Sequence, residues 1–288
     1  MSTTSRTTGA VRTGTAGTDG TTGSVPGAGA VALLPAYRLT LELAWRDFRS
    51  EYPLGMLALV VLPRMVVQTF FWTLLGRVAA GPAGTTFAFV GACVQIMVTT
   101  LVINGADALK NDRLYGTAYR LRLGRVPVLG LVTVRWLVYV FEAVLIAVIC
   151  SVLIGLVIGR AAVLGRLLLA LPLFALLGVC AIGLGVTVAS LTTRVSADTL
   201  VTNATCYLVL AVCGVVAPVP HWAPARFVAD LLPFTPGLKA IRSALAGGSP
   251  WGYVLWEIAL SAAWFALAAV MLRLKAERTR RSGDDDSF

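Results

Sequence analysis

The stretch VLGLVTVRWLVYVFEAVLIAVICSVLIGLVI, residues 128–158, carries two charged side chains, Arg135 and Glu142, in an otherwise uncharged and mostly apolar run. An α-helix needs about 20 predominantly apolar residues to cross the ~30 Å hydrocarbon core of a bilayer. This run is longer than that. The sequence therefore predicts a membrane-spanning helix here that tilts or projects beyond the bilayer.

The composition of the whole chain agrees with this interpretation. Of its 288 residues 57% are hydrophobic and 13% are charged, whereas soluble domains average about 45–50% apolar and about 25% charged residues. So little polar surface cannot cover a globule of this size, and we predict an all-α integral membrane protein. Six runs are near or above spanning length, at about 54–75, 86–108, 128–158, 167–190, 199–217 and 251–272.

Four segments outside these runs differ from them in composition. Residues 1–30 are rich in Thr and Gly and predict a disordered tail, and residues 276–288 predict a charged cytoplasmic tail, so that 31–275 form one transmembrane domain. Residues 37–52 place aromatic side chains opposite Arg and Glu, which predicts an amphipathic helix at the membrane interface, with an ordinary soluble amphipathic helix as the alternative. The proline-rich segment 218–250 predicts one or two short re-entrant helices before the sixth span.

Basic residues flank the predicted spans unevenly. They gather at 38–49 before the first span, at 110–125 between the second and third, and at 273–281 after the sixth. Loops rich in Lys and Arg stay in the cytoplasm. The chain is therefore predicted to be a multi-pass protein of the cell membrane with both termini cytoplasmic.

The sequence offers little for catalysis or for metal binding. It contains no G-x-x-x-x-G-K-[ST], H-E-x-x-H or G-x-S-x-G motif, so we expect no nucleotide, zinc or acyl-transfer site of those kinds on this chain. Its five cysteines all lie in apolar runs without a C-x-x-C pair, and His221 is the single histidine. The net charge of +10 sits beside the spans, which argues against a nucleic-acid-binding domain.

Four polar side chains lie well inside predicted spans, while Asp107 closes the second span and Glu257 opens the sixth. A charge at the centre of a membrane helix costs roughly 2.5–3.5 kcal/mol on insertion scales, so such residues normally face protein or water. They are candidates for a translocation path or gate, or for a structural ion pair such as Arg64 with Glu142. The set is Arg64, Gln68, Arg135 and Glu142.

The loop KNDRLYGTAYRLRLGRVP, residues 110–127, carries a short motif. Asp112-Arg113 is followed by Gly116-Thr117 and later by Pro127, where the third span begins. This order resembles the signature of type-2 ABC exporter permeases, although Leu114 stands where that family usually has a second acid. The resemblance implies that the segment is a cytoplasmic coupling helix that docks on a separate ATPase subunit.

The resemblance covers roughly residues 37–275. The amphipathic helix before the first span looks like the connecting helix of that family, and LPFTPGLKAIR at 232–242 looks like its outer segment. It implies a permease without enzymatic activity of its own. ATP and Mg²⁺ would be bound by the partner ATPase, and a second copy or a sister permease would complete the path.

The cargo is left open by the sequence. The few intramembrane charges favour an amphipathic or lipophilic substrate such as a drug or antibiotic. A polysaccharide or lipid-linked glycan is the alternative, with an aromatic belt supplied by Phe70, Phe71, Trp72, Phe87 and Phe89. A proton-coupled secondary transporter and a membrane-embedded enzyme are the hypotheses from other classes.

Overall fold

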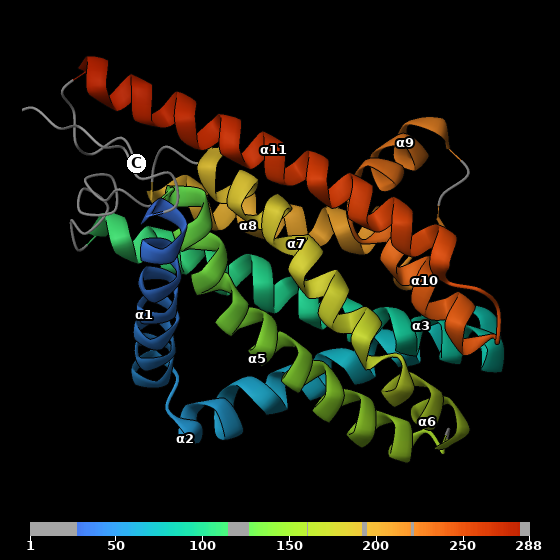
Figure 1. Cartoon of the computed structure of the whole chain (residues 1–288). Coiled ribbons are helices and arrows are strands. Elements are labelled where there is room, and N and C mark those ends of the chain that lie inside the picture. The colour runs from blue at the N-terminus through green and yellow to red at the C-terminus, as the bar shows by residue number, and fades with distance from the viewer. Residues whose placement is uncertain (1–27, 115–126, 160, 192–194, 220–221, 283–288) are drawn as a thin grey trace, which may run out of the picture.

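All regular structure in the described part of the chain is helical (Figure 1), which confirms the predicted all-α class. The computed structural model describes residues 28–114, 127–159, 161–191, 195–219 and 222–282. The helices are α1 (Ala28–Glu51), α2 (Leu54–Met56), the π-helical turn η1 (Leu57–Val61), α3 (Leu62–Leu114), α5 (Val128–Val157), α6 (Ala161–Leu169), α7 (Leu171–Leu191), α8 (Val195–Val212), α9 (Ala223–Leu231), α10 (Thr235–Leu245) and α11 (Trp251–Ser282).

Four helical stretches are long and apolar enough to cross a membrane. They are Leu54–Asp107, Val128–Val157, Leu171–Leu191 and Trp251–Glu277. The apolar part of α8, Thr199–Val212, is shorter, because its 14 residues rise only about 21 Å at 1.5 Å per residue. Six membrane crossings therefore stay a prediction, while four long apolar helices are observed in the described residues.

The first of these stretches combines two predicted spans, 54–75 and 86–108. Its backbone is not helical at Ala80 (φ −141°) and Gly81 (φ 63°), and Pro82 follows. Gly81 adopts a left-handed conformation that favours glycine. The two pieces fold back on each other there, because a Cβ added at Gly76 would meet the side chain of Ala88. The chain thus reverses direction between two apolar helices.

The centre of the bundle is the indole ring of Trp136. This α5 side chain is 1% exposed, and a Cβ on Gly105 of α3 or on Gly185 of α7 would overlap its ring. Two glycines on neighbouring helices thus create the space for one tryptophan. Gly185 belongs to the small residues Ala181, Gly185 and Ala189, whose spacing predicts close helix packing. All three are buried in the structure, which confirms that prediction.

Helix α1 crosses the direction of the long helices at one end of the bundle (Figure 1). Its aromatic face packs partly on α5: Phe48 lies edge-on to Tyr139 at 6.0 Å between ring centroids, and Trp45 lies edge-on to Phe141 at 5.9 Å. The opposite face carries the exposed Arg38–Glu42 ion pair at 3.1 Å. The helix begins at Ala28, earlier than the sequence predicts, because Ala, Val and Leu at 30–34 favour helix despite Pro35.

The same end of the bundle holds the end of α3, the beginning of α5 and the C-terminal part of α11 (Figure 1). The opposite end holds α6, the short helices α9 and α10, and the beginning of α11. Two short helices thus occupy the segment for which the sequence predicts them. Their insertion into a leaflet stays a prediction.

We expect Gly185→Ala to destabilise the protein by about 1–3 kcal/mol, because the added methyl group overpacks the ring of Trp136. The matched control is Gly252→Ala on α11, where an added Cβ meets no atom within 4 Å. That variant should be unchanged or up to about 1 kcal/mol more stable. Thermal unfolding of the purified chain in detergent measures both. Equal midpoints for the two variants would contradict this packing.

Candidate functional site

A cavity of about 260 Å³ lies between the start of the first span, the second piece of α3 and α5. It is on the side of the bundle nearest to the end of α1, since Tyr52 forms part of its wall. Its wall is unusually polar for a bundle of apolar helices. The polar residues that line it are Tyr52, Arg64, Thr99, Thr100, Asn104, Asp107 and Glu142.

Glu142 lies deepest in this cavity. Glu142 is only 2% exposed. Its Oε2 accepts a hydrogen bond of 2.9 Å from Nδ2 of Asn104. Its other oxygen, Oε1, is buried and has no hydrogen-bond partner within the described residues. A buried carboxylate oxygen without a partner carries a desolvation cost. The described protein therefore leaves one acceptor of this buried acid unsatisfied beside the cavity.

Asn104 connects this acid to the end of α1. Its Oδ1 accepts a hydrogen bond of 3.4 Å from the phenol of Tyr52, which directly follows α1. Burial, followed by the charges of the nearby acids Glu51, Glu142 and Asp107 in that order, raises the pKa of Tyr52 to about 12. The phenol therefore stays protonated at neutral pH and remains a donor. The chain Tyr52–Asn104–Glu142 links the end of α1, α3 and α5.

The structure brings together two of the four predicted intramembrane polar residues. Arg64 and Glu142 line this cavity, whereas Gln68 and Arg135 are not among the described residues that line it. The recorded hydrogen-bond partner of Glu142 is Asn104. An ion pair between Arg64 and Glu142 stays a prediction.

Sequence reasoning did not single out Asn104. A signal for it exists in the second span, where polar residues fall three or four positions apart through an otherwise apolar run, with two of them adjacent: Gln95, Thr99, Thr100, Asn104 and Asp107. Such spacing places polar groups along one side of a helix. Gln95 belongs to the same row of polar residues but does not line the same contact. Its Nε2 donates to the carbonyl of Cys206 on α8 at 3.0 Å.

Only some of the predicted coupling residues lie in the described part of the chain. Asp112 and Arg113 belong to the last turn of α3, and Gly116 and Thr117 lie outside the described residues. Pro127 precedes α5 with extended backbone (φ −61°, ψ 126°), and its carbonyl accepts from the N–H of Leu131 at 3.2 Å. The third predicted span thus begins directly after Pro127.

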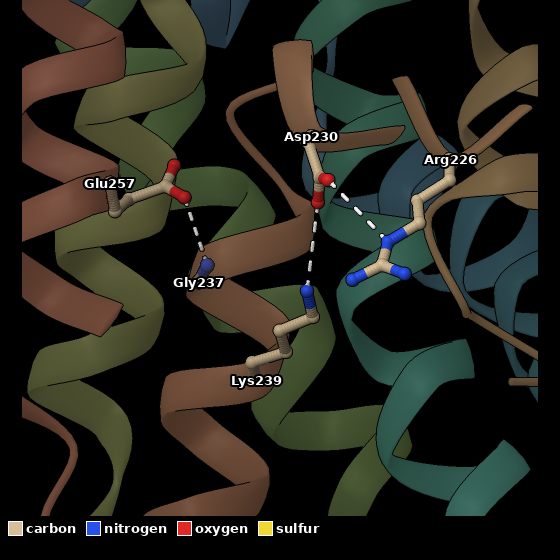
Figure 2. Close-up of polar contacts among 5 residues, drawn as sticks. All are labelled: Arg226, Asp230, Gly237, Lys239 and Glu257. Atoms are coloured by element: carbon tan, nitrogen blue, oxygen red, sulfur yellow. Dashed lines mark hydrogen bonds and ion pairs between the residues drawn. The ribbon is translucent and has the colours of Figure 1, made fainter. Parts of the chain in front are cut away.

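The other end of the bundle is held by contacts between side chains and the main chain. Oε2 of Glu257 on α11 accepts from the N–H of Gly237 in the first turn of α10 at 2.8 Å (Figure 2). A carboxylate there satisfies a free N–H and complements the helix dipole. On α9, the carbonyl of Leu231 accepts from the indole N–H of Trp264 at 2.9 Å. The short helices are thereby tied to α11.

We expect Glu142→Gln to fold with a loss of less than about 1 kcal/mol, because the glutamine oxygen can still accept from Asn104. Glu142→Leu should cost about 1–3 kcal/mol, since it leaves a buried amide without its acceptor. If the charge serves transport, the Gln variant should be folded and inactive. Thermal unfolding and transport measured on the same preparation test this. Normal transport by the Gln variant would reduce Glu142 to a structural acceptor.

The model of the ABC-2 type transporter family matches residues 38–246 of the chain. The match runs from α1, through the walls of the cavity and α5, to the end of α10. No curated protein matches the chain significantly. No solved structure matches it significantly either. The family match covers most of the chain, and the apolar helices agree with it, so this membrane protein belongs to the ABC-2 type transporter family.

Proposed function

We propose that the chain is the membrane-spanning permease subunit of an ATP-binding cassette exporter and that it moves an amphipathic or lipophilic substrate, such as a drug or antibiotic. The observation that carries this proposal is the family match over residues 38–246, from α1 to α10. It includes the loop with Asp112-Arg113 and Gly116-Thr117, which resembles a coupling segment. Both termini would lie in the cytoplasm.

ATP hydrolysis would take place on a separate ATPase subunit. The sequence has no P-loop to hold a nucleotide triphosphate. ATP and Mg²⁺ would therefore be bound by that partner, and this chain would be a permease rather than an enzyme. Two permeases, either identical copies or this chain with a sister, would form the path between them.

The helices that border the coupling segment also form the wall of the cavity, which suggests how motion is transmitted. Asn104 lies ten residues before Leu114 at the end of α3, and Glu142 lies fourteen residues after Val128 at the start of α5. At 1.5 Å per residue these distances are about 15 and 21 Å along rigid helices. A shift of the segment between α3 and α5 would thus move the two partners of one hydrogen bond.

Exposed apolar side chains supply the surface that lipid or a second permease would cover. On the first piece of α3 they are Val67, Phe70, Phe71, Leu74 and Leu75, and further ones lie on α5, α8 and α11. Contiguous exposed apolar surface marks membrane or protein contact. The choice between a homodimer and a heterodimer is not made by this surface.

The positions of the aromatic residues favour a lipophilic cargo over a polysaccharide. Phe89 is buried in the core at 1% exposure, and the ring of Phe87 packs under the guanidinium group of Arg242. Phe71 is exposed and lies edge-on to Trp72 at 5.0 Å. These side chains are thus distributed over separate environments and do not line one continuous sugar path within the subunit.

One observation favours a second candidate function, a proton-coupled secondary transporter. Glu142 has an unpartnered, buried oxygen in a polar cavity, and buried acids within membrane helices often carry protons in such transporters. This alternative requires no ATPase. The two functions differ in their source of energy, so an energetic measurement separates them.

We expect an ATPase subunit to copurify with the tagged chain, and export from cells to stop when ATP is depleted at a constant proton gradient. Gly116→Trp, or reversal of both charges at Asp112 and Arg113, should reduce ATPase binding and transport while membrane insertion stays normal. These changes alter the docking element and leave the spans untouched.

The matched control is Arg46→Glu on the exposed face of α1, which reverses a charge at the same end of the bundle without touching the loop. It should retain ATPase binding better than the loop variants. Export that ignores ATP depletion and collapses with the proton gradient would reject the exporter and support the secondary transporter.

A further inference from the structure

An apolar groove of about 430 Å³ opens between the second piece of α3, α6 and α10, at the end of the bundle opposite α1. Its walls include Phe87, Val90, Val163 and Leu245, and two arginines, Arg166 and Arg242, face the same space. The groove is separate from the polar cavity around Glu142, because the two share no lining residue. The groove thus places two cations beside an apolar wall, and the question is which group neutralises their charge.

Arg242 carries a positive charge that the described protein does not neutralise. Its Nη1 donates to the carbonyl of Gly214 at 2.8 Å, and its Nη2 donates to the carbonyls of Phe87 at 2.9 Å and Val215 at 3.2 Å. Its guanidinium carbon lies 3.4 Å from the centroid of the Phe87 ring. Carbonyls and a ring orient the guanidinium group, but they carry no net charge.

Burial lowers the pKa of Arg242 to about 9, and no carboxylate contributes to that shift. Its Nε is buried without a hydrogen-bond partner among the described residues. A buried charge without a counter-charge is costly. Arg166 adds a second charge at the exposed side of the groove, where its Nη1 donates to the carbonyl of Leu245 at 3.0 Å.

The carboxylates at this end of the bundle are engaged elsewhere (Figure 2). Asp230 lies 3.7 Å from Nζ of Lys239 and 4.0 Å from Nε of Arg226. Glu257 accepts from the main chain of Gly237. Among the residues that the structure describes, no acid lines the groove. The counter-charge for Arg166 and Arg242 is therefore expected from outside the described chain.

The surroundings of the groove indicate what kind of anion fits. Leu169, one turn after Arg166 on α6, is 83% exposed, and Ala83 and Phe87 form apolar wall on α3. A small soluble anion would leave this wall in contact with water. A zwitterionic lipid would bring a cation together with its phosphate and so would supply no net counter-charge to the arginines. A ligand with an anionic head and an apolar tail satisfies both requirements.

We propose that this groove binds an anionic phospholipid of the leaflet at the end opposite α1, with its phosphate on Arg166 and Arg242 and an acyl chain along Phe87, Val90 and Leu245. Arginine binds phosphate with charge-assisted hydrogen bonds. Such a lipid would fill the space between α3, α6 and α10 and would hold the short outer helices against the bundle. The site goes beyond the proposed export function and does not depend on ATP.

The test uses the full chain purified in detergent and supplied with dioleoyl phosphatidylglycerol, dioleoyl phosphatidylcholine or soluble glycerol phosphate. Native mass spectrometry measures the bound lipid, and thermal unfolding measures the shift in Tm. We expect phosphatidylglycerol to bind about tenfold more tightly than phosphatidylcholine, and glycerol phosphate to bind weakest.

Three variants locate the site. Arg166→Gln should weaken binding of phosphatidylglycerol by about tenfold, and Ala83→Trp should block the groove while both arginines remain. Arg226→Gln on α9 is the control, because that exposed arginine lies outside the groove and contacts Asp230. Arg242 itself is left intact, since it holds three carbonyls of the fold.

The proposal stands if the first two variants lose the anionic lipid and the control keeps it. It is overturned if phosphatidylcholine binds as tightly as phosphatidylglycerol, or if glycerol phosphate binds as tightly as the lipid. It is also overturned if all three variants retain the lipid equally. These readouts are independent of transport activity, so a failed export assay leaves the result interpretable.

Discussion

The structure depends on the fit of one large side chain between two glycines. Trp136 of α5 fills the space left by Gly105 on α3 and Gly185 on α7, and a Cβ at either position would overlap its ring. Packing of this kind matters in a bilayer, where lipid tails are as apolar as leucine and helices associate through close contact. The contact also places the polar site, because Asn104 adjoins Gly105 and Glu142 follows Trp136 by six residues, about 9 Å along α5.

Buried polar groups have different kinds of hydrogen-bond partner at the two ends of the bundle. Near α1, a side-chain network through Asn104 leaves one buried oxygen of Glu142 without a hydrogen-bond partner among the described residues. At the opposite end, Glu257, Arg242 and Trp264 use main-chain groups of the short helices α9 and α10 and their neighbours as partners. The first arrangement suits a site that changes its contacts, and the second suits a cap that holds its shape.

Much of this architecture could be predicted from residues whose effect is local. Long apolar runs predict helices, Pro127 predicts where α5 begins, and Ala181, Gly185 and Ala189 predict a packed face. The partner of Glu142 could not be predicted in this way, because Asn104 lies 38 positions earlier and meets it only through the packing around Trp136. The same holds for Arg242, whose carbonyl partner on Phe87 is 155 positions away.

We propose that the chain crosses the membrane with α1 in the cytoplasm and with the turn before α11 outside. The five native cysteines are buried and should not react, so single added cysteines report sidedness. Ser249→Cys, in the exposed turn before α11, should be labelled by a membrane-impermeant maleimide on intact cells. Ser50→Cys, exposed near the end of α1, should be labelled only after permeabilisation. Labelling of Ser50→Cys on intact cells, with Ser249→Cys protected, would contradict this account.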